Sequence, residues 1–350
     1  MLKRQVLKEN PMSNTLDLAV PEVETGCTDL EQLPRDVSPR QYFRGKKGNQ
    51  NIILMVYPEV SDSNKVEMDG FITIGQWLKD QDIKTPELID YNNKKLIGIF
   101  EDLGKVSFGK ALSSGHDQDE LYKSAASVLK ILYRAKPLSN LPQYKERGIY
   151  AKRGQFVEYY MPFEKKQAYV SAKVDEFFKV WDDIEQSLPL CPQGFVHGDF
   201  HLENLMLQEN AQGHRKCALI DYQDGMIGPL PYDLVNLLED ARISVPKSLQ
   251  EEILDDFCAD MGAEEKKNFL NWYRVMGTQF HCRVLGLFIM LAAEQGRDEY
   301  LIHIPRLQNY VLEALDHPVL SPFKDWCMKE ELDFRVIKDL NGEAIRTFFV

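Results

Sequence analysis

The sequence predicts an α+β protein of two lobes, a small N-terminal lobe rich in β-strands and a larger, mainly helical C-terminal lobe. The chain has 350 residues, more than one small domain usually contains. Short runs rich in aromatic and β-branched residues are concentrated in the first third of the chain, whereas apolar residues at helical spacing dominate from Asp119 onward. We therefore predict an N-terminal tail over residues 1–28, an N-lobe over 29–103 and a C-lobe over 104–350.

Composition and charge narrow the classes of protein further. Hydrophobic residues make up 44% of the chain and charged residues 27%, which is typical of a globular protein. The net charge of -12 argues against a protein that binds the nucleic-acid backbone, since such proteins need an excess of positive charge. The 6 cysteines form no C-x-x-C pair, so their spacing predicts neither a zinc site nor a disulfide framework.

No segment has the pattern of a secretion signal or a membrane span. The most apolar segment, residues 284–293, falls short of the ~20 residues that cross a bilayer, and we interpret it as part of a buried helix. We therefore expect a cytoplasmic protein with no membrane and no nucleic-acid partner. The sequence leaves its oligomeric state open.

The N-lobe is predicted from a β-hairpin pattern and from a helix that ends before a second pair of strands. Residues 41–44 and 51–57 are rich in aromatic and β-branched side chains and flank a polar, glycine-containing turn over 45–49. Thr85-Pro86 then interrupts a run of apolar residues at helical spacing. The elements expected around this break are a helix that includes residues 71–78 and a second strand pair, 88–91 and 95–100.

The C-lobe is predicted to be helical with one exception. Apolar residues recur at helical spacing over 121–132 and 177–188, which indicates two amphipathic helices. Between residues 194 and 228, by contrast, short apolar runs alternate with polar clusters, a pattern typical of short strands that carry loops. The strands expected there are 195–196, 205–207 and 218–220.

This exceptional segment contains a pattern that suits phosphoryl transfer. Asp199 and Asn204 are five positions apart in the sequence His-Gly-Asp-Phe-His-Leu-Glu-Asn, and Asp221 follows the apolar run 218–220. A phosphoryl-transfer site needs a carboxylate that accepts the proton of the attacking hydroxyl. It also needs oxygen ligands that hold magnesium against the nucleotide phosphates. The three residues supply this set in the expected order.

The two motifs resemble the Brenner-type motif pair of the aminoglycoside/choline kinase superfamily, whose members are relatives of the protein kinases. Residues 99–104 resemble the interlobe hinge of that family, and 225–238 resemble the loop and helix that follow its second motif. More narrowly, residues 221–234, 279–288 and 300–306 are similar to bacterial anomeric cell-wall sugar kinases, which act on N-acetylmuramate and N-acetylglucosamine. The resemblance covers roughly residues 29–330.

The resemblance implies a two-lobed, protein-kinase-like fold that binds ATP and magnesium between its lobes. Asp199 would be the catalytic base, while Asn204 and Asp221 would hold the metal. The backbone of the hinge residues Glu101, Asp102 and Leu103 would bind adenine. The acceptor implied is a small molecule, an amino sugar phosphorylated at its anomeric hydroxyl in peptidoglycan recycling. The same catalytic set would also serve an aminoglycoside or choline-like acceptor, and a pseudokinase that only binds nucleotide is the alternative from another class.

The sequence departs from the family pattern on the nucleotide side. No lysine lies near Met55, where a kinase carries one, and the turn over 34–40 contains no glycine. We therefore expect Ser38 and Arg40 to meet the phosphates together with backbone N–H groups. Without a strand lysine as its partner, Glu67 is expected to be a solvated carboxylate.

Other polar residues near the motifs have weaker or structural assignments. We expect His197 to pack the loop and His201 to brace it, in preference to a transition-metal site made of both. Asp224 is either a second metal-binding or loop-ordering carboxylate or a turn residue before Gly225, and Asp233 is expected to cap the helix over 234–238 and anchor the loop.

Two residues on the predicted helix over 276–293 are candidates for the acceptor site. Gln279 and Arg283 are one turn apart and could face the same cleft. Phe280 stands where the family often carries an arginine, which leaves Arg283 and His281 as the polar residues nearby. A chain with a net charge of -12 needs a local cation to bind the carboxylate of N-acetylmuramate, and we name Arg283 for this role.

Overall fold

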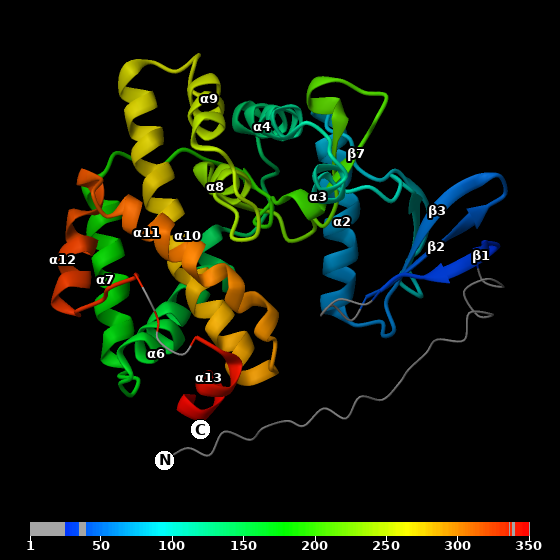
Figure 1. The fold of residues 1–350 in the computed structure, drawn as a ribbon. Helices are drawn as coiled ribbons and strands as arrows, with labels where there is room; N and C mark the ends of the chain where they lie inside the picture. The colour runs from blue at the N-terminus through cyan, green and yellow to red at the C-terminus, as the bar shows by residue number, and fades with distance from the viewer. Residues whose placement is uncertain (1–24, 35–39, 336, 338–339, 350) are drawn as a thin grey trace. The chain divides into compact units, whose positions relative to one another are not determined.

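The protein is described here by a computed structural model that covers residues 25–34, 40–335, 337 and 340–349. The chain forms two compact units (Figure 1). We call the first the sheet unit; it contains the described residues up to Met68 together with Pro86–Asp102. The second, the helical unit, contains Asp69–Thr85 and the chain from Leu103 onward. Most of the predicted tail over 1–28, and Ser38, lie outside the described residues.

The sheet unit is an antiparallel sheet of five strands in the order β1-β2-β3-β5-β4. Its core lies on one face, where alternate residues such as Phe43, Leu54 and Ile99 are buried. This alternation confirms the predicted strand pairs. The strands are β1 (Thr28–Gln32), β2 (Gln41–Lys47), β3 (Gln50–Val56), β4 (Leu88–Asn92) and β5 (Ile97–Glu101).

The β2–β3 hairpin is tighter than the sequence predicted. Lys47 pairs with Gln50, so the turn is the two residues Gly48 and Asn49, and Gly48 has a φ of 61°. Gly45, which was expected in the turn, lies inside β2. A side chain at Gly45 would lie 2.6 Å from Leu30 on β1, so glycine is required there by the close approach of the neighbouring strand.

Helix α2 (Asp62–Asp80) contributes to both units. In its second half, Phe71 stacks on Tyr222 with ring centroids 4.6 Å apart, and Trp77 packs on Phe195 at 5.0 Å. These contacts explain why residues 69–85 belong to the helical unit, whereas the sequence-based division placed them in the N-lobe.

The helices of the second unit form because their apolar residues fall on one face. In α4, the N-cap Asp117 accepts a hydrogen bond from Glu120, and Leu121, Val128 and Leu132 are buried on the same side. The helices are α3 (Phe108–Ser113), α4 (Gln118–Arg134), α5 (Gly148–Ala151), α6 (Met161–Lys165), α7 (Ala172–Ser187), α8 (Pro231–Leu238), α9 (Lys247–Phe257), α10 (Ala263–Gln295), α11 (Ile304–Ala314), α12 (Ser321–Lys329) and α13 (Gly342–Phe349).

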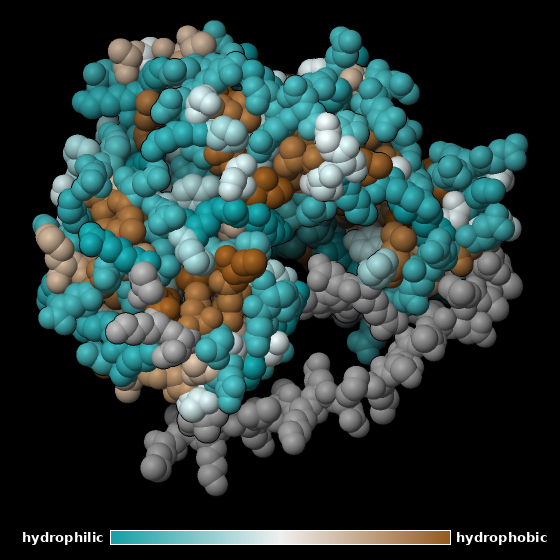
Figure 2. Space-filling view, viewed as in Figure 1, coloured by the Kyte–Doolittle hydropathy of each residue, from teal (hydrophilic) through white to brown (hydrophobic). Residues whose placement is uncertain are grey.

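Helix α10 is the central element of the large hydrophobic core, as Figure 1 shows. It has 33 residues and is the one helix among the described residues that is long and apolar enough to cross a membrane; 78% of its most apolar window is buried inside the protein. Gly286 lets it approach the chain closely, since a Cβ there would lie 2.3 Å from the carbonyl carbon of Gln155. The prediction of a buried helix is confirmed. Hydrophilic residues cover most of the surface in the face shown in Figure 2.

Two short strand pairs carry the loops of the predicted catalytic segment. They are antiparallel, and three of the four strands were predicted from their apolar runs. The pairs are β6 (Gln193–Val196) with β9 (Met226–Pro229), and β7 (Leu205–Leu207) with β8 (Cys217–Leu219).

Candidate active site

The β7–β8 pair brings two of the predicted site residues to the same end of a small sheet. Leu205 pairs with Leu219, and the N–H of Ile220 donates to the carbonyl oxygen of Asn204 at 3.1 Å. Asn204 therefore precedes one strand at the point where Asp221 follows the other. Asp221 has a φ of 60°, a left-handed conformation that aspartate tolerates better than most residues.

Asp199 is connected to this end by the side chain of Asn204. The amide nitrogen Nδ2 of Asn204 donates to the backbone oxygen of Asp199 at 3.0 Å and to its Oδ2 at 3.2 Å. The carboxylate of Asp199 is 63% exposed, so a small molecule can reach it. The structure thus brings Asp199, Asn204 and Asp221 together.

The surroundings of Asp199 keep it ionised. Loss of hydration beside the neighbouring residues raises its pKa, but this is outweighed by the hydrogen bond from His201 and by the charges of His201, His197 and Arg242, which lower the pKa to about 2. The His201 ring accepts from the N–H of Glu203 at Nδ1, which leaves Nε2 to donate to Asp199 Oδ2 at 3.2 Å. His201 therefore braces the loop, as predicted.

The catalytic loop is anchored by Asp233 on α8. Its buried carboxylate accepts hydrogen bonds from the N–H of His197 at 2.6 Å and from the N–H of Gly198 at 2.9 Å. Burial raises the pKa of Asp233, and these two hydrogen bonds act in the opposite direction. The predicted anchoring role is confirmed, but the predicted cap is wrong: α8 begins at Pro231, so Asp233 lies inside its first turn and its oxygens serve the loop instead.

Gly198 and His197 complete the loop's packing. Gly198 has a φ of 86°, and a Cβ at this position would lie 2.7 Å from the Met226 side chain, so the loop requires glycine. His197 is 1% exposed, and its Nε2 lies 3.0 Å from the carbonyl oxygen of Ile220. This bond ties the Asp199 loop to the segment that carries Asp221. Among the described residues, no group of three or more His, Cys, Asp or Glu side chains is arranged to bind a metal.

The donor atoms near Asp199 suit magnesium better than a transition metal. Asn204 uses its amide nitrogen toward Asp199, so its carbonyl oxygen is directed away from that bond, and Asp221 supplies a carboxylate. Oxygen donors of this kind are the ligands that magnesium prefers. Gln223 orients the carboxylate, since its Nε2 donates to Asp221 Oδ1 at 3.0 Å. The residues present therefore fit the predicted ion.

On the sheet unit, Arg40 and Glu67 form an ion pair that the sequence did not predict. Arg40 Nε lies 3.2 Å from Glu67 Oε1, and the Arg40 side chain is only 8% exposed. The expectation of a solvated Glu67 is therefore wrong. Glu67 pairs with an arginine immediately before β2 in place of a lysine on β3, where Met55 is buried.

The hinge residues have their side chains engaged in structure. Arg44 on β2 binds the carboxylate of Asp102 through Nε at 2.8 Å and Nη2 at 3.0 Å. Glu101 accepts a hydrogen bond from the N–H of Glu87. The backbone oxygen of Leu103 lies 3.4 Å from the side-chain nitrogen of Gln208 within the helical unit. The side chains of Glu101 and Asp102 are therefore occupied by contacts within the protein.

Asp224 orders the loop that follows Asp221. Arg147 Nη2 donates to the backbone oxygen of Asp224 at 2.8 Å and lies 3.5 Å from its carboxylate, which is 69% exposed. Among the roles that the sequence left open, this contact is the one expected of a loop-ordering carboxylate.

The family now follows from comparison with known proteins. Residues 29–267 match the APH phosphotransferase enzyme family. The chain belongs to this family. It is therefore a phosphotransferase, and the motifs that carry Asp199, Asn204 and Asp221 lie inside the matched region.

Relatives and solved structures agree with the family. The chain is 25% identical to the N-acetylmuramate/N-acetylglucosamine kinase of Caulobacter vibrioides, with 86% of this chain and 92% of that protein covered. It is also 25% identical to the kinase of the same name from Pseudomonas aeruginosa, covering 86% and 90%.

The aminoglycoside phosphotransferase APH(2'')-Ib, in its ADP-bound structure, matches with a TM-score of 0.56 at 16% identity, covering 86% and 97%. The choline kinase LicA from Streptococcus pneumoniae matches with a TM-score of 0.53 at 14% identity, covering 85% and 97%. These likenesses confirm the predicted fold class.

Gln279 and Arg283 were expected to face the same cleft, but their side chains contact different residues. Gln279 is 2% exposed, and its amide lies between the buried Arg153, at 2.7 Å, and Glu185, at 2.9 Å. Arg283 instead donates through Nη2 to the hydroxyl of Tyr232 at 3.2 Å. The structure thus separates two residues that the helical spacing had grouped.

Two residues of the site region escaped the sequence analysis. Ser107 caps α3 and donates to the carboxylate of Glu203 at 2.7 Å, which fixes α3 to the catalytic loop. Arg242 lies in the segment that follows α8, and its positive charge helps to lower the pKa of Asp199. Neither contact has a local sequence signal, because the partners are far apart in the chain.

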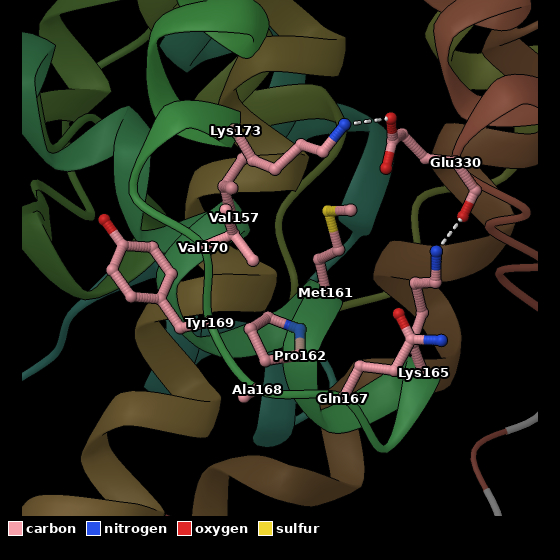
Figure 3. Close-up of a pocket in the computed structure, with 10 residues that line it drawn as sticks. All are labelled: Val157, Met161, Pro162, Lys165, Gln167, Ala168, Tyr169, Val170, Lys173 and Glu330. Carbon is pink, nitrogen blue, oxygen red and sulfur yellow. Dashed lines mark hydrogen bonds and ion pairs between the residues drawn. The ribbon is translucent and has the colours of Figure 1, made fainter.

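The helical unit also contains a pocket of about 70 Å³ whose lining includes none of the predicted site residues (Figure 3). It lies beside α6, the start of α7 and the end of α12, none of which carries the site residues. Two lysines on its wall point to one residue: Lys173 pairs with the Glu330 carboxylate at 2.7 Å, and Lys165 donates to the Glu330 carbonyl oxygen at 2.5 Å. These bonds join the three helices.

Proposed function

We propose that this phosphotransferase is a magnesium-dependent kinase that transfers the γ-phosphate of ATP to the anomeric hydroxyl of N-acetylmuramate or N-acetylglucosamine. The observation that carries the proposal is the exposed, ionised Asp199 held by Asn204 beside Asp221. The acceptor class is supported by the two relatives named for these sugars, which match over 86% of the chain. The ADP-bound structural neighbour supports a nucleotide donor.

The chemistry follows from the position of Asp199. Its carboxylate accepts the proton of the sugar hydroxyl as that oxygen attacks the γ-phosphorus in line, while the bond from phosphorus to the bridging oxygen breaks and ADP leaves. Because the pKa of Asp199 is about 2, the base is ionised throughout the neutral range. Magnesium, bound by Asn204 and Asp221, would neutralise charge on the phosphates.

On the donor side, Arg40 takes the role of the absent strand lysine. In kinases, a lysine that binds the phosphates is oriented by a glutamate on a helix. Here Glu67 on α2 orients Arg40, with Arg40 Nε 3.2 Å from Glu67 Oε1 and the arginine side chain nearly buried. Arginine is a good phosphate ligand because it can present two parallel N–H groups. The adenine contacts are assigned to the backbone of residues 101–103.

An acceptor panel tests this function. ADP release is measured with magnesium and ATP in the presence of N-acetylmuramate, N-acetylglucosamine, choline and kanamycin, with Asp199→Asn as the matched inactive variant. We expect turnover with at least one of the two sugars and an acid-labile product. Turnover with choline or kanamycin alone would replace the acceptor assignment, and nucleotide binding without turnover on any acceptor would identify a pseudokinase.

A further inference from the structure

Arg242, in the segment that follows α8, is oriented on one edge by a buried aspartate. The N–H of Arg242 donates to Asp240 Oδ1 at 2.5 Å, its Nε donates to the same oxygen at 3.1 Å, and its Nη2 donates to Oδ2 at 2.7 Å. The Asp240 side chain is 6% exposed, whereas that of Arg242 is 39% exposed. The guanidinium is therefore fixed on its Nε edge and open on its Nη1 edge, where no described residue accepts a hydrogen bond.

A second arginine holds the same segment from α11. Arg306 donates through Nη1 to the carbonyl oxygen of Ala241 at 2.6 Å and through Nη2 to the hydroxyl of Ser244 at 2.9 Å. These bonds tie the segment that carries Arg242 to α11. They also add a positive charge, so Arg242 and Arg306 together exceed Asp240 by one charge.

Arg242 lies near enough to the catalytic loop for its charge to act there. Its charge acts on both Asp199 and Glu203, and it is one of the groups that lower the pKa of Asp199. Arg242 and Asp199 both belong to the helical unit, so their relative placement is set within one compact unit. An anion bound to the open edge of Arg242 would therefore lie close to the base that receives the proton of the acceptor.

Arg283, the cation expected from the sequence, is less suited to bind a ligand. Its Nη2 is used by the Tyr232 hydroxyl, and its guanidinium lies over the Phe280 ring at 5.3 Å. Its Nε is buried and has no hydrogen-bond partner among the described residues, so a ligand cannot reach that edge. These contacts are typical of an arginine that positions Tyr232.

We propose that Arg242 binds a carboxylate carried by the sugar acceptor and so sets a preference for acidic amino sugars over neutral ones. The proposal rests on the proposed function and names the substrate class of that site. N-acetylmuramate has a lactyl carboxylate, whereas N-acetylglucosamine has none, and the two sugars otherwise share the ring. A fixed guanidinium with a free edge binds such a group through parallel N–H donors.

The test compares kcat/KM for the two sugars in the full-length enzyme and in Arg242→Met. Loss of a charge-assisted hydrogen bond predicts a fall in the N-acetylmuramate to N-acetylglucosamine ratio by about tenfold or more, mainly through KM. Arg242→Lys should lower the ratio less than Arg242→Met does, because lysine keeps the positive charge but lacks the two parallel N–H donors of the guanidinium. Arg283→Met should leave the ratio unchanged.

Two further variants keep the result interpretable. Arg215→Met is the matched control, since Arg215 also binds an aspartate, Asp82, through Nε and Nη2 at 3.0 and 2.9 Å on an exposed surface of the same unit. It should not alter the ratio. Because Arg242→Met leaves Asp240 buried without its cation, the double variant with Asp240→Asn removes that charge and should show the same lowered ratio.

The outcomes separate this proposal from the proposed function. A ratio that does not fall in Arg242→Met or in the double variant, or one that falls instead in Arg283→Met, would overturn the role of Arg242 while leaving the kinase function intact. Turnover of neither sugar would contradict the proposed function. In that case, calorimetric binding of N-acetylmuramate to wild type and Arg242→Met decides the carboxylate role, and equal or absent binding in both overturns it.

Discussion

The two units of this phosphotransferase depart from the kinase pattern to different degrees. In the helical unit, Asp199, Asn204 and Asp221 stand at the expected spacing and meet at one end of the β7–β8 pair. In the sheet unit, the expected lysine is missing, and an arginine immediately before β2 pairs with Glu67. The comparison suggests that proton transfer and metal binding tolerate little change in position, whereas a phosphate ligand can come from any element that brings a cation to the same place.

The largest effect is expected from replacing Asp199 in the helical unit. Asp199→Asn should lower kcat by about 10² to 10⁴, because a general base acts on the transferred proton. Nucleotide affinity should change little, since Asp199 is not assigned to the donor. Steady-state kinetics and a fluorescent-nucleotide titration measure the two quantities. Normal turnover in the variant would remove Asp199 from its role.

The two residues proposed to bind magnesium provide the next largest effect. Asp221→Ala and Asn204→Ala should each raise the magnesium concentration needed for half-maximal activity by about tenfold or more, because each removes an oxygen ligand from a small set. The check is a magnesium titration at saturating ATP, with Asp224→Ala as the control from the same loop. Titration curves that match the wild type would contradict both assignments.

The proposed role of the sheet unit, binding of the ATP phosphates by Arg40, is tested by replacing Arg40 and Glu67. Arg40→Met should raise KM for ATP by about tenfold, because it removes a charge-assisted contact to phosphate, with little change in KM for the sugar. Glu67→Gln should have a smaller effect in the same direction, since it only loosens the orientation of Arg40. If both KM values for ATP equal that of the wild type, Arg40 is structural.

The smallest effect concerns a buried histidine in the helical core. Burial lowers the pKa of His281 to about 3, a shift that the Arg274 charge reinforces and the contact with the Glu239 backbone opposes. The unfolded chain therefore binds a proton below about pH 6.5 that the folded chain does not, so stability falls as the pH decreases from there toward 3. His281→Phe should remove up to about 1.4 kcal/mol per pH unit from this slope.

Urea unfolding at a series of pH values between 6.5 and 4 measures the slope for His281→Phe. The phenyl ring can keep the stacking on Tyr310, whose ring centroid is 4.7 Å from that of His281. Parallel curves for variant and wild type would show that His281 does not titrate on unfolding in this range. His281 is assigned no part in the reaction, so His281→Phe also serves as a control for changes in activity that arise only from a change in the stability of the helical unit.

Sequence analysis succeeded where the determinants are local. The helices around 121–132 and 177–188 were predicted because apolar periodicity reports burial directly, and the strand pair 205–207 with 218–220 because its runs are short and bounded by polar residues. Strand β1 was not predicted, since its sequence Thr-Asp-Leu-Glu-Gln lacks the aromatic and β-branched residues that mark a strand.

The contacts that sequence analysis missed join residues far apart in the chain. Glu67 with Arg40, Ser107 with Glu203, and Arg242 with Asp199 depend on the folded backbone and leave no periodic signal. The grouping of Gln279 with Arg283 failed for a related reason. Helical spacing says that two side chains share a face, but the neighbouring elements decide that one contacts Arg153 and the other Tyr232.

The central claim, transfer of phosphate to the anomeric hydroxyl by Asp199, is tested most directly by phosphorus NMR of the product. The enzyme is incubated with magnesium, ATP and N-acetylmuramate or N-acetylglucosamine, and the phosphorus signal is recorded with proton coupling. A phosphate on the anomeric oxygen gives a doublet that a proton–phosphorus correlation assigns to the anomeric proton, whereas a phosphate on another ring oxygen gives a doublet with a different proton; we predict the anomeric doublet for wild type and expect it to be absent for Asp199→Asn. A triplet, which reports a phosphate on the exocyclic CH₂ oxygen, or inorganic phosphate alone, would contradict the assignment.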